Sequence, residues 1–209
     1  MTASDATFGS KATSSNDAKH QSRNPLQRFV IDRFHREIVN AVQQTRAETV
    51  LDVGCGEGYT LAALRDGGIA AKLSGVELSG TAVEQAKRRL GAAATVWQGD
   101  ARELSTEADS RYDLVMMLEV LEHLDRPEQM LPILERLTNR FVLLSVPWEP
   151  LFRGANLLRG RHLSRLGNHP EHVNLWSRSA FLEFVSQRFN LVATPMAAPW
   201  TIALAERRG

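Results

Sequence analysis

Short apolar segments and helical segments take turns along most of this chain, and this alternation limits the folds that the chain can adopt. The apolar segments have strand length and are TVLDV, KLSGVEL, ATVWQ, YDLVMML and RFVLLSV, at residues 49–53, 72–78, 94–98, 112–118 and 140–146. Helical segments are predicted to follow the first, second and fourth of them, the last helix ending near Leu137. Such alternation is typical of parallel strands joined by right-handed crossovers, with helices on both faces of the sheet. The sequence therefore predicts a doubly wound α/β sheet.

The two ends of the pattern predict an added helix and an added strand pair. Residues 25–45 place apolar side chains near helical spacing, with Asn24 as a cap and Pro25 in the first turn, which predicts an amphipathic helix. Near the other end, NLVAT (190–194) and WTIALAE (200–206) lie too close together for a crossover helix. These two segments are predicted to pair as an antiparallel hairpin, which completes a mostly parallel sheet of seven strands.

Length and composition indicate a single globular unit with a tail. The 209 residues are 43% hydrophobic, which is enough for one buried core. Residues 1–24 are small and polar and are expected to form a mobile tail, so the domain is predicted at 25–209, with a lid or substrate insertion at about 147–176. Lys and Arg (25) nearly balance Asp and Glu (24), so no overall attraction to nucleic acid or anionic membranes is expected. One cysteine and no apolar run of membrane-spanning length favour a cytoplasmic protein without a membrane span.

The segment VLDVGCGEGYT, residues 50–60, places three glycines at alternate positions directly after the first predicted strand. In a doubly wound sheet this loop lies at the edge where ligands bind. Its spacing differs from the Gly-x-Gly-x-x-Gly fingerprint of dinucleotide sites, in which a helix N-terminus binds a pyrophosphate. Bare backbone at Gly54, Gly56 and Gly58 would let a nucleoside approach closely, and Asp52 would suit an ammonium or sulfonium cation better than a phosphate. A tight turn without any ligand is the alternative interpretation of the glycines alone.

Two further acidic residues end the next two predicted strands. Glu77 ends the second, where a carboxylate can accept hydrogen bonds from both hydroxyls of a ribose. Asp100 follows the third, where its side chain could accept from an exocyclic amine while the backbone of Ala101 serves a ring nitrogen. Either acid alone is typical of a solvated strand end or a helix cap. Three acids at the ends of successive strands, around one glycine loop, instead indicate a binding site. Its ligand would be an adenosine without phosphates that carries a positively charged amino-acid tail.

In their order and spacing, VLDVGCGEGYT, GVELSG, WQGDA, YDLVMMLEVLEHL and FVLLSVP resemble the class I S-adenosylmethionine (SAM)-dependent methyltransferases, over about residues 48–205. The resemblance implies a Rossmann-like fold, methyl transfer as the activity and SAM as the cofactor. The residues that it assigns to the cofactor are Asp52, Gly54, Cys55, Gly56 and Gly58 for the methionine part, Glu77 for the ribose, Asp100 and Ala101 for the adenine, with Leu78 and Glu119 as further contacts.

The family's chemistry requires few groups of the enzyme itself. Methyl transfer from a sulfonium is an in-line displacement, so alignment of nucleophile and methyl supplies much of the catalysis. An oxygen nucleophile also needs a base or a metal to remove its proton. The candidate bases are His123, His169 and His172.

A metal-assisted reaction is the main alternative. If LEVLEHL is helical, Glu119, Glu122 and His123 share one face at i, i+3 and i+4. Together with His172 they could hold Mg²⁺ or Mn²⁺, an arrangement similar to that of the small-RNA 3′-terminal ribose methyltransferases. The same EVLEHL pattern with a following histidine also occurs in small-molecule members of the family that use no metal, such as the ubiquinone- and sugar-modifying enzymes.

The substrate side is predicted in the insertion. It carries a row of arginines that suits an anionic acceptor or is merely a solvated helix face, namely Arg153, Arg159, Arg161 and Arg165. Trp148 either lines a pocket for a flat acceptor or belongs to the core. The segment lacks the interleaved aromatic residues of a platform for single-stranded RNA. We therefore expect a methyltransferase that acts on O, N or C of a small molecule, with a metal-assisted RNA ribose 2′-O-methyltransferase and a non-methylating nucleotide-binding protein as alternatives.

Overall fold

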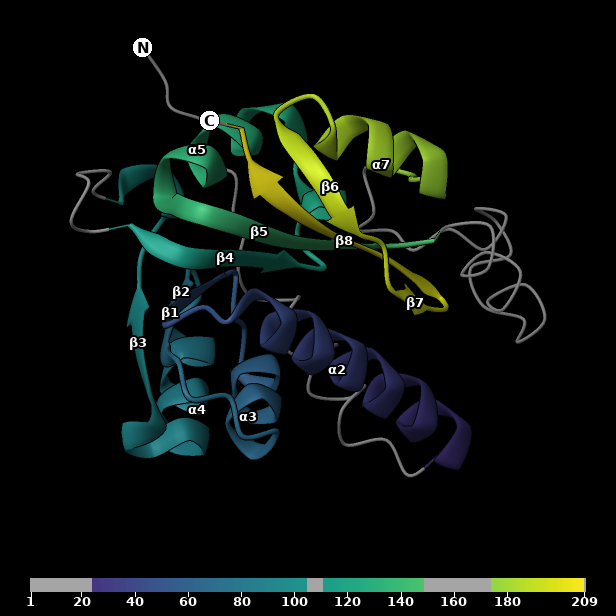
Figure 1. Ribbon diagram of the computed structural model, residues 1–209. Helices are drawn as coiled ribbons and strands as arrows, with labels where there is room; N and C mark the ends of the chain where they lie inside the picture. The colour runs from purple at the N-terminus through teal and green to yellow at the C-terminus, as the bar shows by residue number, and fades with distance from the viewer. Residues whose placement is uncertain (1–23, 105–110, 149–173, 209) are drawn as a thin grey trace, which may run out of the picture.

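The fold is one mixed β-sheet with helices on both faces, shown in Figure 1 as a computed structural model that describes residues 24–104, 111–148 and 174–208. The strands are β1 (Thr49–Val53), β2 (Lys72–Glu77), β3 (Ala94–Gln98), β4 (Tyr112–Leu118), β5 (Thr138–Pro147), β6 (Phe189–Ala193), β7 (Met196–Ala197) and β8 (Trp200–Arg207). The helices are α2 (Pro25–Thr45), α3 (Tyr59–Asp66), α4 (Gly80–Leu90), α5 (Met130–Leu137) and α7 (Arg178–Val185). Four 3-10 turns in the described residues are η1 (Gly91–Ala93), η2 (Ala101–Glu103), η4 (Leu121–His123) and η5 (Pro127–Gln129).

The sheet has the strand order β3-β2-β1-β4-β5-β8-β6. Strands β1 to β5 pair in parallel, whereas β8 runs antiparallel to both β5 and β6. This confirms the predicted doubly wound sheet with a C-terminal antiparallel pair. The short strand β7, which pairs with β8, was not predicted and brings the sheet to eight strands.

Helix α2 begins where its capping residues predict. The side chain of Asn24 accepts a hydrogen bond of 3.0 Å from the backbone N–H of Leu26, and Pro25 occupies the first turn, where its missing N–H costs nothing. Phe34, Ile38 and other side chains of one face of the helix are buried. The predicted amphipathic helix is therefore confirmed, and its apolar face lies against the sheet.

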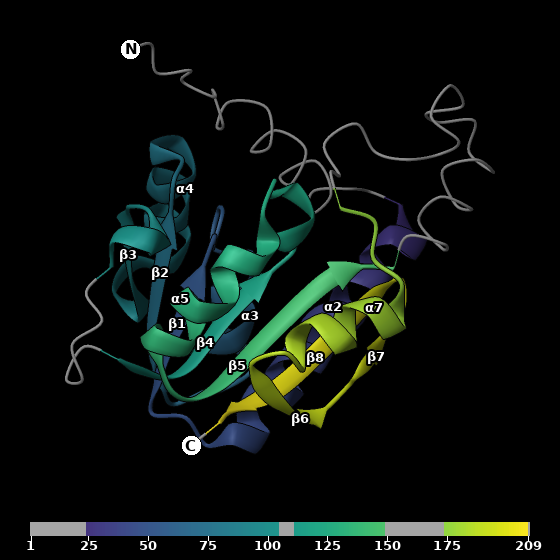
Figure 2. The same cartoon turned by 90° about the horizontal axis from the view of Figure 1, so that it is seen from above.

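Two hydrophobic clusters lie on opposite faces of the sheet because successive strand residues point to opposite sides. In β1, Val50 belongs to the cluster that includes residues of α2, α3 and α4, whereas its neighbour Leu51 belongs to the cluster with α5 and α7. Figure 1 and Figure 2 show the same division, with α2 to α4 on one face and α5 and α7 on the other. Among the described residues, no helix is both long and apolar enough to cross a membrane.

The prediction that Glu119, Glu122 and His123 share one helical face is wrong. Glu119 follows β4 with a left-handed φ of 59°, and only the short turn η4 comes before the chain extends again. Pro127 disfavours helix at Arg126, which has φ −135° and ψ 73°, so η4 does not continue into η5 and α5, and α5 runs from Met130. Glu122 is buried whereas His123 is partly exposed.

Candidate functional site

The carboxyl ends of β1 to β4 meet at one edge of the sheet, and most of the predicted site residues follow them. The register places Val53 of β1 opposite Val76 of β2, and Glu77 opposite Gln98 of β3. Because these strands are parallel, the residues that come after them gather at the same edge. The glycine loop follows β1 and continues into α3.

The glycine loop is tied to the neighbouring strand by its own backbone. The N–H groups of Gly54 and Cys55 both donate to the carbonyl of Val76, at 2.8 and 3.2 Å. Gly54 has a φ of 75°, and a Cβ placed there would lie 2.7 Å from a methyl carbon of Val120. Gly58, with a φ of 77°, would likewise bring a Cβ to 2.9 Å from Leu90. These two glycines are therefore required by the packing of the loop itself.

The carboxylate of Glu77 is oriented by the loop. It accepts one hydrogen bond from the N–H of Gly56, at 3.0 Å, and one from the N–H of Ser79, at 2.9 Å. A carboxylate has about four acceptor positions, so two remain for a ligand. The vicinal hydroxyls of a ribose are donors that fit this remaining capacity.

Asp52 is a buried acid with only 3% of its surface exposed. Burial, together with the neighbouring negative charge of Glu77, raises the pKa of Asp52 from 3.8 to about 7. A cationic ligand group beside Asp52 would stabilise the ionised carboxylate and reverse this shift. The edge of the sheet therefore favours a positively charged partner.

A cavity of about 90 Å³ opens beside Asp52. Its lining combines the first loop, the end of β4, one face of α2 and the first residue of β8, namely Ile31, Phe34, His35, Asp52, Gly54, Cys55, Tyr59, Thr60, Leu118, Glu119 and Trp200. Glu77, Asp100 and Ala101 do not line it, so the cavity belongs to the Asp52 end of the site.

Burial lowers the pKa of His35, a lining residue of the cavity, and the nearby charge of Asp32 partly offsets this effect. The thiol pKa of Cys55 is raised mainly by burial, so this cysteine is a neutral packing residue.

Several lining residues were not predicted as site residues from the sequence. Phe34 was expected only as part of the apolar face of α2, and Trp200 only as the start of a strand. Their rings pack with a centroid separation of 4.7 Å although 166 positions separate them along the chain. Only the tertiary fold brings them to the glycine loop.

Glu119 is held by contacts from two neighbouring strands. Its Oε2 accepts a hydrogen bond of 2.5 Å from the indole Nε1 of Trp200, and its Oε1 accepts one of 3.4 Å from the hydroxyl of Ser145. Its backbone N–H donates to the carbonyl of Ser145 at 3.1 Å. These contacts maintain its left-handed backbone and place a second carboxylate in the cavity of Asp52.

Asp100 is engaged within the chain. It accepts hydrogen bonds of 2.9 Å from the backbone N–H and the side-chain Nε of Arg102, and the guanidinium of Arg102 lowers the pKa of Asp100. An exocyclic amine would have to share these oxygens with Arg102. Ala101 is buried beside it, and Leu78, the residue after β2, is 53% exposed.

The predicted histidines are only partly located. His123 lies in η4 with its Nε2 4.0 Å from a carboxylate oxygen of Glu122, and it does not line the cavity. His169 and His172, like the four arginines of the insertion, lie outside the described residues. Within the described ranges, no three His, Cys, Asp or Glu side chains form a group that could hold a metal ion.

The tryptophans that flank the insertion do not line the cavity either. Trp176 packs against Phe181 and Phe184 in the core, with centroid separations of 5.9 and 4.9 Å. Trp148 is anchored through its backbone, which donates to the carbonyl of Pro199 at 2.8 Å. Asn174 fixes η4 through hydrogen bonds from its side chain to backbone carbonyls there.

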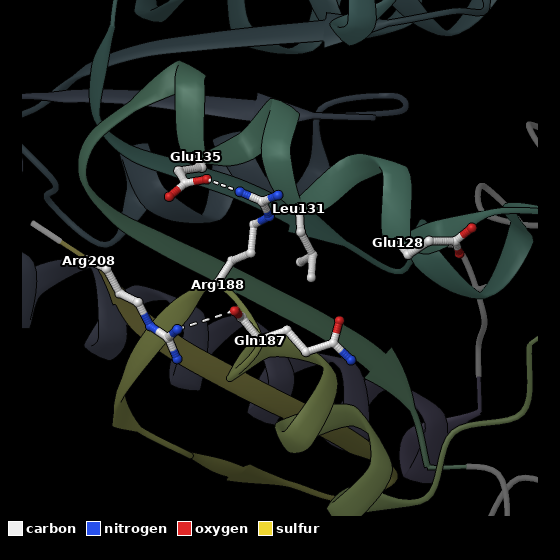
Figure 3. Close-up of a pocket in the computed structure, with 6 residues that line it drawn as sticks. All are labelled: Glu128, Leu131, Glu135, Gln187, Arg188 and Arg208. Atoms are coloured by element: carbon white, nitrogen blue, oxygen red, sulfur yellow. Dashed lines mark hydrogen bonds and ion pairs between the residues drawn. The ribbon is translucent and has the colours of Figure 1, made fainter.

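A second, larger hollow of about 430 Å³ lies away from the glycine loop, between α5 and the turn after α7. Figure 3 shows its lining, which is Glu128, Leu131, Glu135, Gln187, Arg188 and Arg208. Arg188 pairs with Glu135 at 2.7 Å, and Arg208 donates to the backbone carbonyl of Gln187 at 3.3 Å. Arg188 and Arg208 are therefore already bound by groups of the protein, and none of the predicted site residues lines this hollow.

Comparisons with known proteins agree with a methyltransferase fold. A family model described as a methyltransferase domain matches residues 50–140. The ubiquinone biosynthesis O-methyltransferase of Pseudomonas paraeruginosa is 29% identical over 172 residues, which are 75% of this chain and 73% of that protein. The solved structure of magnesium protoporphyrin IX methyltransferase from Synechocystis PCC 6803 with bound SAH has a TM-score of 0.72 at 20% identity, and the match covers 94% of this chain and 93% of that one. The methyltransferase domain of bacterial CtHen1 has a TM-score of 0.64 at 24% identity, covering 84% and 98%.

Proposed function

We propose that this chain, which belongs to the class I SAM-dependent methyltransferases, transfers the methyl group of SAM to a small-molecule acceptor. The observation that carries the proposal is the shared cavity, where the buried Asp52 and the partly buried Glu119 face an apolar and aromatic wall that includes Phe34 and Trp200. Two carboxylates suit a cationic cofactor, and an aromatic wall suits an acceptor with a flat or apolar body. Relatives named for ubiquinone and magnesium protoporphyrin methylation support an acceptor of this class.

The cofactor would be held by the residues at the edge of the sheet. SAM, when bound, supplies a methyl group on a positively charged sulfur. In our proposal Asp52 and Glu119 bind its positively charged amino-acid end, Glu77 binds the ribose hydroxyls, and the Asp100–Ala101 turn binds the adenine. The fit rests on acceptor groups at every one of these positions except Ala101, whose backbone would serve a ring nitrogen.

The chain's contribution to catalysis is alignment and exclusion of water. Ile31, Phe34 and Leu118 supply apolar surface beside the two carboxylates, so a bound acceptor would be held in a dry pocket. For an oxygen acceptor we propose that His123, His169 or His172 removes the proton. Each of these assignments is tested by its own alanine substitution, because loss of the base lowers turnover without lowering SAM affinity.

Removal of the Glu77 carboxylate is expected to weaken SAM binding by about 10-fold to 100-fold, since hydrogen bonds to charged groups contribute roughly 1.5 to 3 kcal/mol. Isothermal titration calorimetry of the wild-type chain and of Glu77→Ala measures this. Glu135→Gln, in the hollow of Figure 3, is the control and should leave the affinity unchanged. An absence of saturable SAM binding to the wild type, or equal affinity for Glu77→Ala, would refute the proposed function.

The RNA alternative needs its own test. Of its four proposed metal ligands, the described residues Glu119, Glu122 and His123 form no group that could hold a metal ion, and His172 lies outside the described residues. We expect no transfer of labelled methyl from SAM to the 3′ end of short RNA, either with Mn²⁺ or after chelation with EDTA. Incorporation that requires Mn²⁺ and is lost in His172→Ala would instead establish the metal-assisted reaction.

A further inference from the structure

Trp200 joins three parts of the molecule at the cavity. It is the first residue of β8 and pairs with Pro147, the last residue of β5. Its ring packs on Phe34 of α2, with an interplanar angle of 44°. Its indole N–H points to the carboxylate of Glu119, the residue after β4. One residue therefore links α2 and Glu119 through its side chain and β5 through its backbone.

Glu119 is a residue whose position needs such support. Its φ of 59° is uncommon for a residue with a side chain, and that conformation persists only where surrounding contacts maintain it. Its carboxylate also lines the same cavity as Asp52. An indole N–H can donate but not accept, so Trp200 stabilises the carboxylate in one orientation.

We propose that Trp200 is a positioning residue, which holds the Glu119 carboxylate where it binds the positively charged amino-acid end of the cofactor. The inference rests on the proposed function, and it deepens that function by assigning the tail-binding carboxylate a specific support. The cavity supports this division of roles. Glu119 and Trp200 line it together with Asp52, whereas Glu77 and Asp100, proposed for the adenosine, do not. Loss of the indole N–H should therefore weaken binding of the tail and leave binding of the adenosine intact.

Two ligands separate these effects, because S-adenosylhomocysteine carries the amino-acid tail and 5′-methylthioadenosine lacks it. Calorimetry of Trp200→Phe, which keeps an aromatic ring but removes the N–H, should show about 10-fold weaker binding of S-adenosylhomocysteine. Binding of methylthioadenosine should stay within about 2-fold of the wild type. Glu119→Gln should give the same pattern with at least as large a loss, and the double variant should lose little more than Glu119→Gln alone because Trp200 acts through Glu119.

Trp176→Phe is the matched control, since it removes an indole N–H from the core away from the cavity. It should change neither affinity. Equal affinity of Trp200→Phe and wild type for S-adenosylhomocysteine would overturn the proposal, and so would a parallel loss of methylthioadenosine binding, which indicates a general structural role. If Trp200→Phe does not fold, unchanged tail binding in Glu119→Gln overturns it. Failure of the wild type to bind either ligand would instead refute the proposed function.

Discussion

Replacement of Asp52 by asparagine is expected to abolish SAM binding and, at the same time, to stabilise the ligand-free protein at pH 8. Burial and the charge of Glu77 raise the pKa of Asp52 to about 7 in the folded state, above its ordinary value of 3.8. The folded protein therefore binds more protons than the unfolded chain between these pH values, and the free energy of unfolding falls as the pH rises. Asparagine keeps the shape of the side chain but carries no charge, so the variant avoids this loss.

The size of the effect follows from the shift. At 1.36 kcal/mol for each tenfold change in proton affinity, the ionised Asp52 costs the ligand-free fold on the order of 4 kcal/mol at pH 8. A domain of this length gains about 2 to 4 °C in melting temperature per kcal/mol. We expect Asp52→Asn to melt about 8 to 16 °C above the wild type at pH 8. At pH 5 the folded Asp52 is protonated and only the ionisation of the unfolded chain counts, about 1.6 kcal/mol, so the difference should shrink to about 3 to 6 °C. Differential scanning calorimetry at both pH values measures this.

Asp113 provides a control of opposite sign. Burial alone would raise its pKa, but hydrogen bonds from the backbone N–H groups of Glu48 and Thr49 and from the Thr49 hydroxyl lower it overall. Asp113→Asn should therefore destabilise the protein at pH 8. Two results would contradict the proposed role of Asp52 in binding a positively charged ligand group. One is a lower melting temperature of Asp52→Asn than of the wild type at pH 8, and the other is equal SAM affinity of the two proteins.

The local features of this fold were predictable because they depend on neighbours in sequence. Asn24 and Pro25 mark the start of α2 by capping chemistry, and the short spacing between 190–194 and 200–206 permits only an antiparallel return. The gathering of Asp52 and Glu77 at one edge follows from the rule that parallel strands end on the same side. No tertiary contact had to be known for any of these predictions.

The features that could not be predicted depend on contacts between distant segments. The residues of LEVLEHL have helical spacing, yet Glu119 adopts a left-handed backbone because Trp200 and Ser145 hold it from two other strands. The engagement of Asp100 with Arg102 is local, but nothing in a pattern of strand ends distinguishes a paired carboxylate from one reserved for a ligand. Sequence patterns therefore located the edge of the site, while the orientation of its side chains came from packing.

The glycine loop allows steric and conformational costs to be separated, and Gly54→Ala is expected to destabilise the protein by about 2 to 5 kcal/mol. Roughly 1 to 2 kcal/mol comes from a side chain at positive φ, and about 1 to 3 kcal/mol from forcing a Cβ to 2.7 Å from Val120. Gly68→Ala is the matched control, because Gly68 has the same φ of 75° and a Cβ added there would meet no atom within 4 Å. It should show the conformational cost alone.

A double variant completes this comparison. Val120→Ala removes the methyl groups that a Cβ at Gly54 would contact, so Gly54→Ala in the Val120→Ala background should cost about as much as Gly68→Ala does in the wild type. Urea unfolding of all four variants and the wild type gives the free energies. Because the N–H groups of Gly54 and Cys55 tie the loop to Val76, a loop displaced by the clash should also bind SAM more weakly, and Val120→Ala should restore part of that affinity. Equal destabilisation by Gly54→Ala and Gly68→Ala would show that Val120 yields and that the loop tolerates a side chain in this direction.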